Sequence, residues 1–349
     1  MKKYWIITYG CQMNVSDNEK IASVLERRGY RRASKEKEAD LIAVNMCSVR
    51  QSAVDRAYAK INKYYKTKKI ILAGCILQTD KKKLKDKVAE FWHPDKYFER
   101  SPIYQSKFSA FVPIMTGCNN FCAYCVVPYT RGREVSRKAD EIIKEVKSLI
   151  KKGYSQRDKS LFHPSLCSGK EIILLGQNVN SYKNKKVNFP DLLKKINTLK
   201  GGFRLNFLTS HPKDMSDKLI ETMAQCKKLT PYLHLPMQSG DNQILKKMNR
   251  HYTTTQYKNL IRKIRQKIPG IKISTDIIVG FPDETKKQFQ STANLCKAVK
   301  FDKAYISKYS ARPGTPAAEL KDNVSLQEKK RRWQILEKLI NKKHVKKRS

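Results

Sequence analysis

Short apolar segments alternate with longer segments of helical periodicity along the first part of the chain. Apolar runs at residues 4–9, 40–46 and 70–73 are predicted to be buried β-strands, and residues 17–28 and 52–66 carry apolar positions at helical spacing. Strands that alternate with helices form parallel sheets with the helices packed on their faces. The pattern therefore predicts an α/β domain with a parallel sheet of the Rossmann or flavodoxin type.

The same alternation continues through most of the remaining chain. The strand segments predicted there are residues 111–115, 171–175, 203–208, 232–235, 272–279 and 303–308. The helical segments between them are residues 138–152, 191–199, 216–227, 255–268 and 285–299. Six strand–helix units fit a partial (β/α)6 barrel of the TIM type, whose functional loops follow the carboxyl ends of the strands. We expect a first domain at residues 1–100, the barrel at 101–328 and a basic C-terminal helix or tail at 329–349.

Each predicted strand of the first domain is followed by a cysteine, namely Cys11, Cys47 or Cys75. The carboxyl ends of parallel strands share one edge of the sheet, so these three thiols are expected to meet in space. A free cysteine also packs well as a small hydrophobic residue, and this alternative would be preferred for any one of them. For three cysteines at equivalent strand ends, the sequence favours a metal site with three thiolates.

A second set of cysteines, Cys118, Cys122 and Cys125, is compact and has the spacing CxxxCxxC. Nine cysteines in a cytoplasmic chain point to metal ligation or redox chemistry rather than to disulfides. Thiolates select iron–sulfur clusters or zinc, and structural zinc would need a fourth ligand, for which His163 and Cys167 are candidates. Three cysteines on a 4Fe-4S cube instead leave one iron open for a ligand from outside the protein.

Polar and glycine-rich segments follow the predicted barrel strands. They are residues 176–180, 209–212, 236–240, 280–284 and 310–315. Each alone is compatible with an ordinary turn, because Gly, Pro, Asn and Ser are common in turns. Five such segments on one predicted rim favour a binding site for a small molecule. The histidines in or near this rim, His211 and His234, are expected to be structural.

The chain is strongly basic, with 73 Lys and Arg against 31 Asp and Glu and a formal net charge of +42. Its 40% of hydrophobic residues can build a core, so the charge does not indicate disorder. The longest apolar runs, such as residues 70–77, are far shorter than the roughly 18–20 residues of a membrane-spanning helix. Adsorption to a membrane is one alternative explanation of the charge, but no strongly amphipathic N-terminal helix supports it. A lysine-rich genome is another, but it would be expected to raise the glutamate content as well. We therefore favour a polyanionic partner in the cytoplasm.

The CxxxCxxC motif with an aromatic residue, Tyr124, before its last cysteine resembles the motif of radical S-adenosylmethionine (SAM) enzymes. In those enzymes SAM chelates the open iron, and an electron from the cluster yields a 5′-deoxyadenosyl radical. With the three earlier cysteines, the chain resembles the radical-SAM methylthiotransferases over nearly all of residues 4–340. Within that family it is similar to the tRNA 2-methylthio-N6-(dimethylallyl)adenosine synthase branch. The motifs that carry this similarity are Gly10-Cys11-Gln12-Met13-Asn14, Asn45-Met46-Cys47-Ser48-Val49-Arg50, Pro128-Tyr129-Thr130-Arg131-Gly132-Arg133-Glu134 and Leu174-Leu175-Gly176-Gln177-Asn178-Val179-Asn180-Ser181-Tyr182.

The resemblance implies two 4Fe-4S clusters, an auxiliary one on Cys11, Cys47 and Cys75 and a SAM-binding one on the CxxxCxxC motif. It implies two SAM molecules per turnover, one to methylate a sulfur on the auxiliary cluster and one to form the radical. The product would carry a methylthio group at carbon 2 of N6-prenylated adenosine beside the anticodon of a tRNA. The residues expected to bind SAM are Tyr124, Gln177, Asn178, Ser210, Gln238 and Gly280. Those expected to contact the substrate are Gln12, Asn14, Arg50, Arg131, Arg133 and Arg312.

Three features depart from the family pattern. The stretch between Cys75 and Cys118 is short, so we expect the first domain to lack a strand–helix unit. Residues 154–170 are an insertion, expected to be a surface loop in which Cys167 is unligated. The chain ends soon after residues 312–315, which leaves no room for the RNA-binding TRAM domain of the family.

We hypothesise that the basic C-terminal segment, residues 329–349, takes the place of that domain in tRNA binding. A helix at residues 330–340 is expected to pack Trp333, Leu336 and Leu339 or Ile340 on the barrel. A solvated charged end is the alternative. The basic residues counted in this segment are Lys329, Lys330, Arg331, Arg332, Lys338, Lys342, Lys343, Lys346, Lys347 and Arg348.

Two other classes of function stay open from the sequence. The same chemistry could act on a ribosomal protein or on threonylcarbamoyladenosine in tRNA, or the chain could be a non-catalytic iron–sulfur RNA-binding paralogue. For an enzyme, the resemblance implies an electron donor such as flavodoxin or ferredoxin and a donor of iron and sulfur. We expect a monomer with no membrane association.

Overall fold

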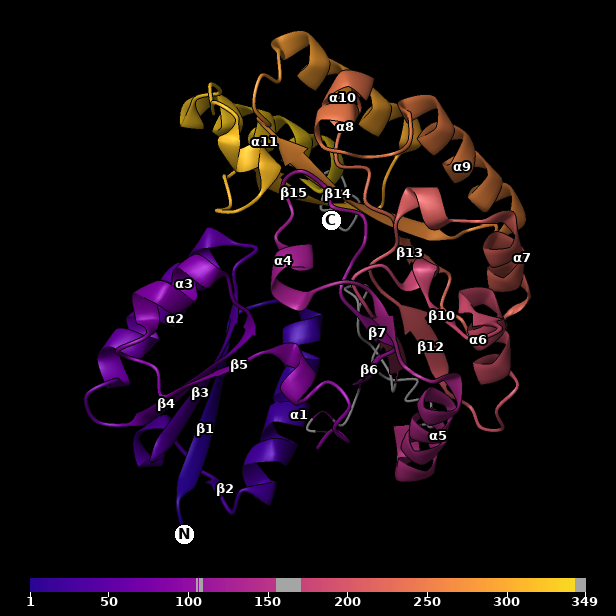
Figure 1. Ribbon diagram of the computed structural model, residues 1–349. Helices are drawn as coiled ribbons and strands as arrows, with labels where there is room; N and C mark the ends of the chain where they lie inside the picture. Colours follow the sequence, from indigo (N-terminus) through magenta and orange to yellow (C-terminus); the bar gives the residue numbers. More distant parts are fainter. Residues whose placement is uncertain (105, 107–108, 155–170, 343–349) are drawn as a thin grey trace.

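The first part of the chain folds around a five-stranded parallel sheet (Figure 1). The computed structural model describes residues 1–104, 106, 109–154 and 171–342. The strands of this sheet are β1 (Lys3–Thr8), β2 (Arg31–Arg32), β3 (Leu41–Cys47), β4 (Lys69–Cys75) and β5 (Glu90–Trp92). The helices that connect them are α1 (Gln12–Arg27), α2 (Gln51–Tyr64) and α3 (Gln78–Leu84). The spatial order β2-β1-β3-β4-β5 is that of flavodoxin-like sheets, which bind ligands where the order reverses, between β1 and β3.

The central strands of this sheet are buried on both faces. Every residue of β3 is buried, because α1 covers one face of the sheet while α2 and α3 cover the other. A continuous apolar run is the expected sequence of such a strand, and the predictions for residues 4–9, 40–46 and 70–73 are confirmed. The short stretch between Cys75 and Cys118 nevertheless contains α3 and β5, so it retains a helix and a strand.

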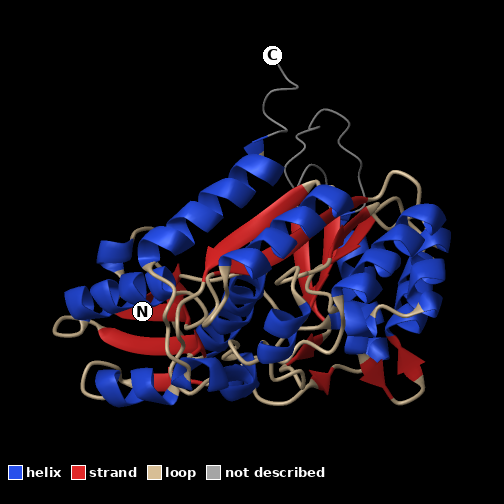
Figure 2. Cartoon of the chain, turned by 90° about the horizontal axis from the view of Figure 1, so that it is seen from above, coloured by secondary structure: helices blue, strands red, loops and turns tan. Residues whose placement is uncertain are grey.

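The second part of the chain is an open barrel of six parallel strands surrounded by helices (Figure 2). The strands are β6 (Ser109–Pro113), β9 (Glu171–Leu175), β12 (Arg204–Phe207), β13 (Tyr232–His234), β14 (Lys272–Val279) and β15 (Lys303–Lys308). The outer helices are α5 (Ala139–Leu149), α6 (Phe189–Asn197), α7 (Asp217–Gln225), α9 (Thr254–Lys267) and α10 (Lys286–Val299). Within the described ranges the strands form two three-stranded sheets, β12-β9-β6 and β13-β14-β15, and no pairing joins β15 to β6, so the fold predicted from the sequence is confirmed as a partial barrel.

Several short elements escape the sequence pattern. They are β7 (Met115–Thr116), α4 (Val127–Arg131), β8 (Val135–Ser136), β10 (Lys183–Asn184), β11 (Val187–Asn188) and α8 (Asn242–Lys247). Single helical turns lie at Glu36–Glu38, Pro94–Lys96, Val179–Ser181, Pro212–Asp214 and Pro316–Glu319, and a π-turn lies at Ile150–Tyr154. Elements this short show too few residues to establish a period of two or of 3.6, so hydrophobic patterning cannot reveal them.

Helix α1 connects the two parts of the molecule. The alternate residues Ile173 and Leu175 of β9 face away from the outer helices, and together with Phe111 and Leu208 they pack against Met13 of α1. Met13 lies two residues after Cys11. This apolar contact therefore fixes the edge of the first sheet against the inner face of the barrel.

Helix α11 (Leu326–Ile340) packs along the barrel as the sequence predicted. Leu336 and Ile340 are buried in the barrel core, and the indole nitrogen of Trp333 donates to the carbonyl oxygen of Ile306 at 3.1 Å. Leu339 is partly buried against the same core. The prediction for this helix is confirmed.

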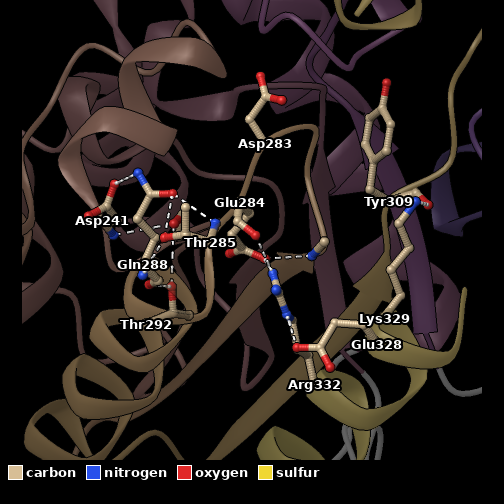
Figure 3. A network of polar contacts seen from close by, with 12 residues as sticks. Asp241, Asp283, Glu284, Thr285, Gln288, Thr292, Tyr309, Glu328, Lys329 and Arg332 are labelled. Carbon is tan, nitrogen blue, oxygen red and sulfur yellow. Dashed lines mark hydrogen bonds and ion pairs between the residues drawn. The ribbon is translucent and has the colours of Figure 1, made fainter. Parts of the chain in front are cut away.

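Two of the basic residues counted in the C-terminal segment are not available to a polyanion. Lys329 and Arg332 are buried. Lys329 pairs with Asp322 at 2.6 Å, and Arg332 pairs with Glu284 at 2.6 Å (Figure 3). A charge removed from water requires such a partner, which the sequence count did not consider. The segment is therefore less basic toward solvent than predicted. Four further basic residues of that count lie outside the described residues, namely Lys343, Lys346, Lys347 and Arg348. The insertion residues His163 and Cys167 lie outside them as well.

We expect Arg332→Met to destabilise the protein by about 3–5 kcal/mol, because it leaves the buried carboxylate of Glu284 without its cation. The free energy of unfolding, measured with urea on the iron-free protein, tests this. Arg331→Met is the matched control, since the exposed Arg331 pairs with Glu328 on the surface and should cost less than about 1 kcal/mol. Equal losses in the two variants would contradict the prediction.

Among the described residues, no helix is long and apolar enough to span a membrane.

Candidate functional site

The three cysteines of the first domain lie together at the carboxyl edge of its sheet. Cys47 and Cys75 are the last residues of β3 and β4 and face each other in register, while Cys11 precedes the first turn of α1. Cys47 and Cys75 are buried and Cys11 is exposed. A hydrogen bond with Cys75, burial, and the charges of Cys75 and Cys11 raise the pKa of Cys47, so the three thiols share one local environment. The structure thus brings together the residues that the sequence predicted would meet.

Arg131 joins this set to the barrel. It lies at the end of α4, six residues after Cys125, and its Nε donates to the sulfur of Cys75 at 2.9 Å. Its Nη2 pairs with the buried carboxylate of Asp17 on α1. The hydrogen bond with Cys47 and the guanidinium of Arg131 lower the pKa of the Cys75 thiol to about 6. Cys75 is therefore the thiol of this set most inclined to be a thiolate, the form that binds iron.

An amide network fixes Cys11 against β3. Asn14 accepts from the backbone nitrogen of Cys11 at 3.3 Å and donates to the side chain of Asn45 at 2.8 Å. Asn14 was predicted to contact substrate, and here its side chain is engaged within the protein. Asn45 was not among the predicted site residues, although a fully buried amide inside an apolar strand is a signal that could have found it.

Gly74 allows β4 to approach this network closely. It has φ +99°, and a Cβ there would lie 2.3 Å from the carbonyl oxygen of Met46 and 2.4 Å from the side chain of Asn45. The first is a backbone atom and the second belongs to a side chain that hydrogen bonds to Asn14 and Asn18 hold in place, so the position admits no side chain without a shift of the strand ends.

We expect Gly74→Ala to destabilise the protein by about 2–4 kcal/mol and to lower the iron bound by the first domain, because the strand ends that carry Cys47 and Cys75 must separate. Urea unfolding of the iron-free protein and iron content after anaerobic reconstitution measure the two effects. Gly29→Ala is the control: its φ is +81°, but nothing lies within 4 Å of the added carbon, so it should cost about 1–2 kcal/mol and retain iron. Similar iron loss in both variants would contradict the argument.

The CxxxCxxC cysteines lie in a loop that the barrel holds tightly. The backbone nitrogen of Cys118 donates to the carbonyl oxygen of Gly132 at 3.1 Å. At Gly117, with φ +79°, a Cβ would lie 2.0 Å from the carbonyl oxygen of Arg133. Cys118 and Cys122 are buried and Cys125 is partly exposed. The half-buried Tyr124 packs in a small apolar cluster that includes Phe281 and Tyr309.

The distances between the sulfur atoms of each cysteine set determine whether the set can bind a single metal ion or a larger cluster. In the part of the chain that the structure describes, no three His, Cys, Asp or Glu side chains converge closely enough to hold a single metal ion. A 4Fe-4S cluster is larger, and each of its cysteines ligates a different iron, so its ligands need not converge on one point.

Asn249 and Arg250, between α8 and α9, contact the CxxxCxxC loop, which the sequence did not predict. The side chain of Asn249, a residue with φ +55°, donates to the carbonyl oxygens of Asn120 at 3.3 Å and Phe121 at 2.9 Å. Arg250 Nη1 donates to the sulfur of Cys122 at 3.4 Å. A polar stretch between two helices resembles an ordinary linker, and no hydrophobic period marks it.

The polar residues predicted to bind SAM lie on the barrel rim with unused hydrogen-bonding atoms. Within the described chain, four of these predicted residues have a buried side-chain oxygen without a partner: Gln177 Oε1, Asn178 Oδ1, Ser210 Oγ and Gln238 Oε1. Each such atom costs about 1–3 kcal/mol unless a ligand or water satisfies it. Donors and acceptors on three successive strand ends match the amino, carboxylate and hydroxyl groups of SAM, so these residues fit that cofactor.

Gly280, the sixth predicted SAM residue, has a different surrounding. Its φ is +69°, and a Cβ there would lie 2.3 Å from Cγ of Lys329 on α11. Its nitrogen donates to Glu284, the partner of Arg332 (Figure 3). This glycine makes room for the lysine side chain, and its contact with SAM stays a prediction.

The predicted substrate residues divide into two groups. Gln12, Arg50 and Arg133 are exposed beside the cysteine sets, and the Arg133 guanidinium lies 4.2 Å from the ring centre of Phe121. Arg312 is buried and donates to Gln51 of α2 at 2.8 Å. With Asn14 and Arg131, it is engaged inside the protein.

The two histidines of the rim are held by hydrogen bonds. Nδ1 of His211 accepts from the backbone nitrogen of Lys213 at 3.2 Å, and burial together with nearby cations lowers the pKa of His211 to about 2. His234 contacts Ser274 at 2.8 Å and Asp276 at 3.1 Å. His211 is therefore neutral across the physiological range of pH.

A flavodoxin-like sheet with three cysteines at its carboxyl edge, and an open barrel with three cysteines on one loop, define a two-domain protein of the radical SAM class. The Radical SAM superfamily profile matches residues 112–157 and 160–296, and the profile described as "Uncharacterized protein family UPF0004" matches residues 3–92. Among solved structures, the cobalamin-dependent radical SAM enzyme OxsB has a TM-score of 0.58 at 10% identity, over 98% of this chain and 56% of that one, which shows a shared fold.

Curated relatives identify the family. The tRNA-2-methylthio-N(6)-dimethylallyladenosine synthase of Syntrophomonas wolfei is 42% identical over 374 residues, 96% of this chain and 81% of that protein. The protein of the same name from Carboxydothermus hydrogenoformans is 42% identical over 97% of this chain and 83% of its own length. The chain belongs to the tRNA-2-methylthio-N(6)-dimethylallyladenosine synthase family, and the resemblance inferred from its motifs is confirmed.

Proposed function

We propose that this protein transfers a methylthio group to carbon 2 of N6-prenylated adenosine beside the anticodon of tRNA, by SAM-derived radical chemistry. The observation that carries the proposal is the contact of Arg131 with Cys75, which joins a second cysteine set to the loop of the CxxxCxxC set. A radical enzyme that only cleaves SAM needs one cluster. A second cluster beside the first supplies what the names of the relatives require, a sulfur to transfer.

In this proposal each part of the chain has a defined task. When bound, the two 4Fe-4S clusters and SAM supply the electron, the radical, the methyl group and the sulfur. Cys118, Cys122 and Cys125 hold one cluster, and Cys11, Cys47 and Cys75 hold the other. The unsatisfied rim atoms orient SAM, while the burial of Cys47, Cys75, Cys118 and Cys122 keeps water away from reactive groups. Arg131 holds Cys75 and α1 in register with the barrel.

The tRNA would be held by charge and by exposed polar residues. The net charge of +42 attracts phosphates, and the exposed Gln12, Arg50 and Arg133 lie beside the two cysteine sets. Carbon 2 of adenine is a poor electrophile, so radical chemistry is needed to replace its hydrogen. The base must also be unstacked from the anticodon loop and presented to the rim. The exposed part of the basic C-terminal segment adds to this surface in our proposal.

We further propose the division of the chain into residues 1–100, 101–328 and 329–349 and the action of the protein as a cytoplasmic monomer. Its electron donor would be a flavodoxin or ferredoxin, with a separate donor of iron and sulfur.

Mass spectrometry of tRNA nucleosides tests the function. The gene is expressed in a host that lacks this activity, and the 2-methylthio form of the prenylated adenosine is expected to appear. The Cys122→Ala variant serves as the negative control. If the methylthio group appears on threonylcarbamoyladenosine or on a ribosomal protein instead, the substrate is wrong. If it appears nowhere while both clusters assemble, the non-catalytic alternative gains support.

A further inference from the structure

Arg250 is a buried arginine whose charge has no carboxylate partner among the described residues. It is 7% exposed and takes part in no ion pair. Its Nη1 donates to the sulfur of Cys122 at 3.4 Å, its Nη2 to the carbonyl oxygen of Pro236 at 3.2 Å and its Nε to the hydroxyl of Tyr252 at 3.1 Å. All of these are neutral acceptors unless Cys122 is a thiolate.

Three other buried cations are compensated by carboxylates, while the buried Lys20 donates to the carbonyl oxygen of Phe98 and burial lowers its pKa to about 8, a shift toward neutrality that a guanidinium cannot make. Arg131 pairs with Asp17, Arg332 with Glu284 and Lys329 with Asp322. Burying an unpaired charge is costly, so a guanidinium in this position requires an anion that arrives with a ligand. Arg312, the other buried arginine without an ion pair, donates to Gln51 and Ser310 and lies at the other cysteine set.

The orientation of Arg250 is fixed independently of the cysteines. The hydroxyl of Tyr252 accepts from Nε of Arg250 and donates to the carbonyl oxygen of Met237 at 2.8 Å. Nη2 is held by Pro236, so Nη1 is directed at Cys122 by the backbone of the barrel rim. The guanidinium is therefore preorganised rather than drawn in by the sulfur.

We propose that Arg250 is a positioning residue that supplies the compensating positive charge for the cluster held by Cys118, Cys122 and Cys125 and raises its reduction potential. A 4Fe-4S cluster bound by three thiolates carries a net negative charge, and reduction adds one more electron. Hydrogen bonds to the ligand sulfurs and nearby charge are among the terms that set the potential of such clusters. A fixed cation at Cys122 favours the reduced state, the state from which SAM is cleaved. The inference rests on the proposed function only in that these cysteines must bind a cluster.

A redox titration of the reconstituted full-length protein, followed by electron paramagnetic resonance, tests this. The signal that changes on addition of SAM reports the cluster in question. At a fixed ambient potential near the wild-type midpoint, Arg250→Gln is expected to lower the ratio of reduced to oxidised cluster at least tenfold, which is about 59 mV for a one-electron couple. Arg250→Lys keeps the charge and should recover most of the wild-type ratio.

Two further variants separate this effect from a general loss of structure. Arg265→Gln is the matched control, since Arg265 donates to the carbonyl oxygens of Val299 and Lys300, away from both cysteine sets, and should leave the ratio unchanged. Tyr252→Phe removes the acceptor of Nε and the hydroxyl's own bonds to the carbonyl oxygens of Pro236 and Met237 but keeps the guanidinium, so it should lower the ratio less than Arg250→Gln and keeps the test open if that variant does not fold.

Equal ratios in wild type and Arg250→Gln would overturn the inference, as would an equal fall in Arg265→Gln. Neither result would affect the tRNA nucleoside assay. A wild-type protein that binds no iron after anaerobic reconstitution would overturn the proposed function and this inference together.

Discussion

Replacing Cys122 with alanine is expected to reduce SAM cleavage to the uncatalysed level. Cys122 is a buried member of the CxxxCxxC set, and the barrel aims Arg250 at its sulfur. Alanine removes one of three thiolates and leaves the guanidinium without its anion, so the cluster loses both a ligand and its local charge balance. The 5′-deoxyadenosine formed after chemical reduction measures this directly, and bound iron should fall in parallel.

The control for this prediction is Cys296→Ala. Cys296 is a buried cysteine on α10 that belongs to neither set, and burial raises its pKa to about 12, so it is a protonated thiol at neutral pH. Its replacement should leave SAM cleavage and iron content unchanged. If Cys122→Ala still cleaved SAM at the wild-type rate, the assignment of the CxxxCxxC set to the SAM-cleaving cluster would be wrong.

The architecture and the two cysteine sets could be predicted from the sequence because burial leaves a periodic record. In β3, a strand covered on both faces, every residue from Leu41 to Cys47 is buried, and the apolar run predicted the strand. The alternation of strands and helices then implied a parallel sheet, and a parallel sheet brings its carboxyl ends to one edge. The meeting of Cys11, Cys47 and Cys75 follows from topology alone.

The contacts between loops could not be predicted in this way, because no periodicity records them. Asn249 and Arg250 lie between two helices and reach a loop more than a hundred residues earlier in the chain. Arg131 was predicted to contact substrate, yet its guanidinium joins Cys75 to Asp17. A sequence shows that a side chain can donate hydrogen bonds, whereas the acceptor depends on the packing of distant segments.

Charge counting has a similar limit. The count of +42 is a property of the whole chain, but Lys329 and Arg332 are buried against carboxylates and contribute little to the surface. The salt dependence of tRNA binding should therefore reflect exposed cations such as Arg50 and Arg133 more than these two.

Replacing Cys47 with alanine is expected to separate the two halves of the reaction: SAM cleavage continues at a rate close to wild type, while methylthio transfer to tRNA is lost. Cys47 contacts Cys75 at the edge of the first sheet, whereas the CxxxCxxC loop is held by Gly132, Arg133 and Asn249 of the barrel. Loss of the first set thus leaves the second intact. Measuring 5′-deoxyadenosine and the 2-methylthio nucleoside in one reaction tests both halves.

Replacing Cys47 distinguishes the tasks of the two clusters more cleanly than replacing Cys75 does. Cys75→Ala would also remove the acceptor of Arg131, which lies on the helix that follows the CxxxCxxC loop, and so is expected to lower SAM cleavage as well. The difference between the two variants measures the mechanical link between the sites. If Cys47→Ala abolished SAM cleavage as completely as Cys122→Ala, the two cysteine sets would act as one centre, and the assignment of separate tasks to them would have to be abandoned.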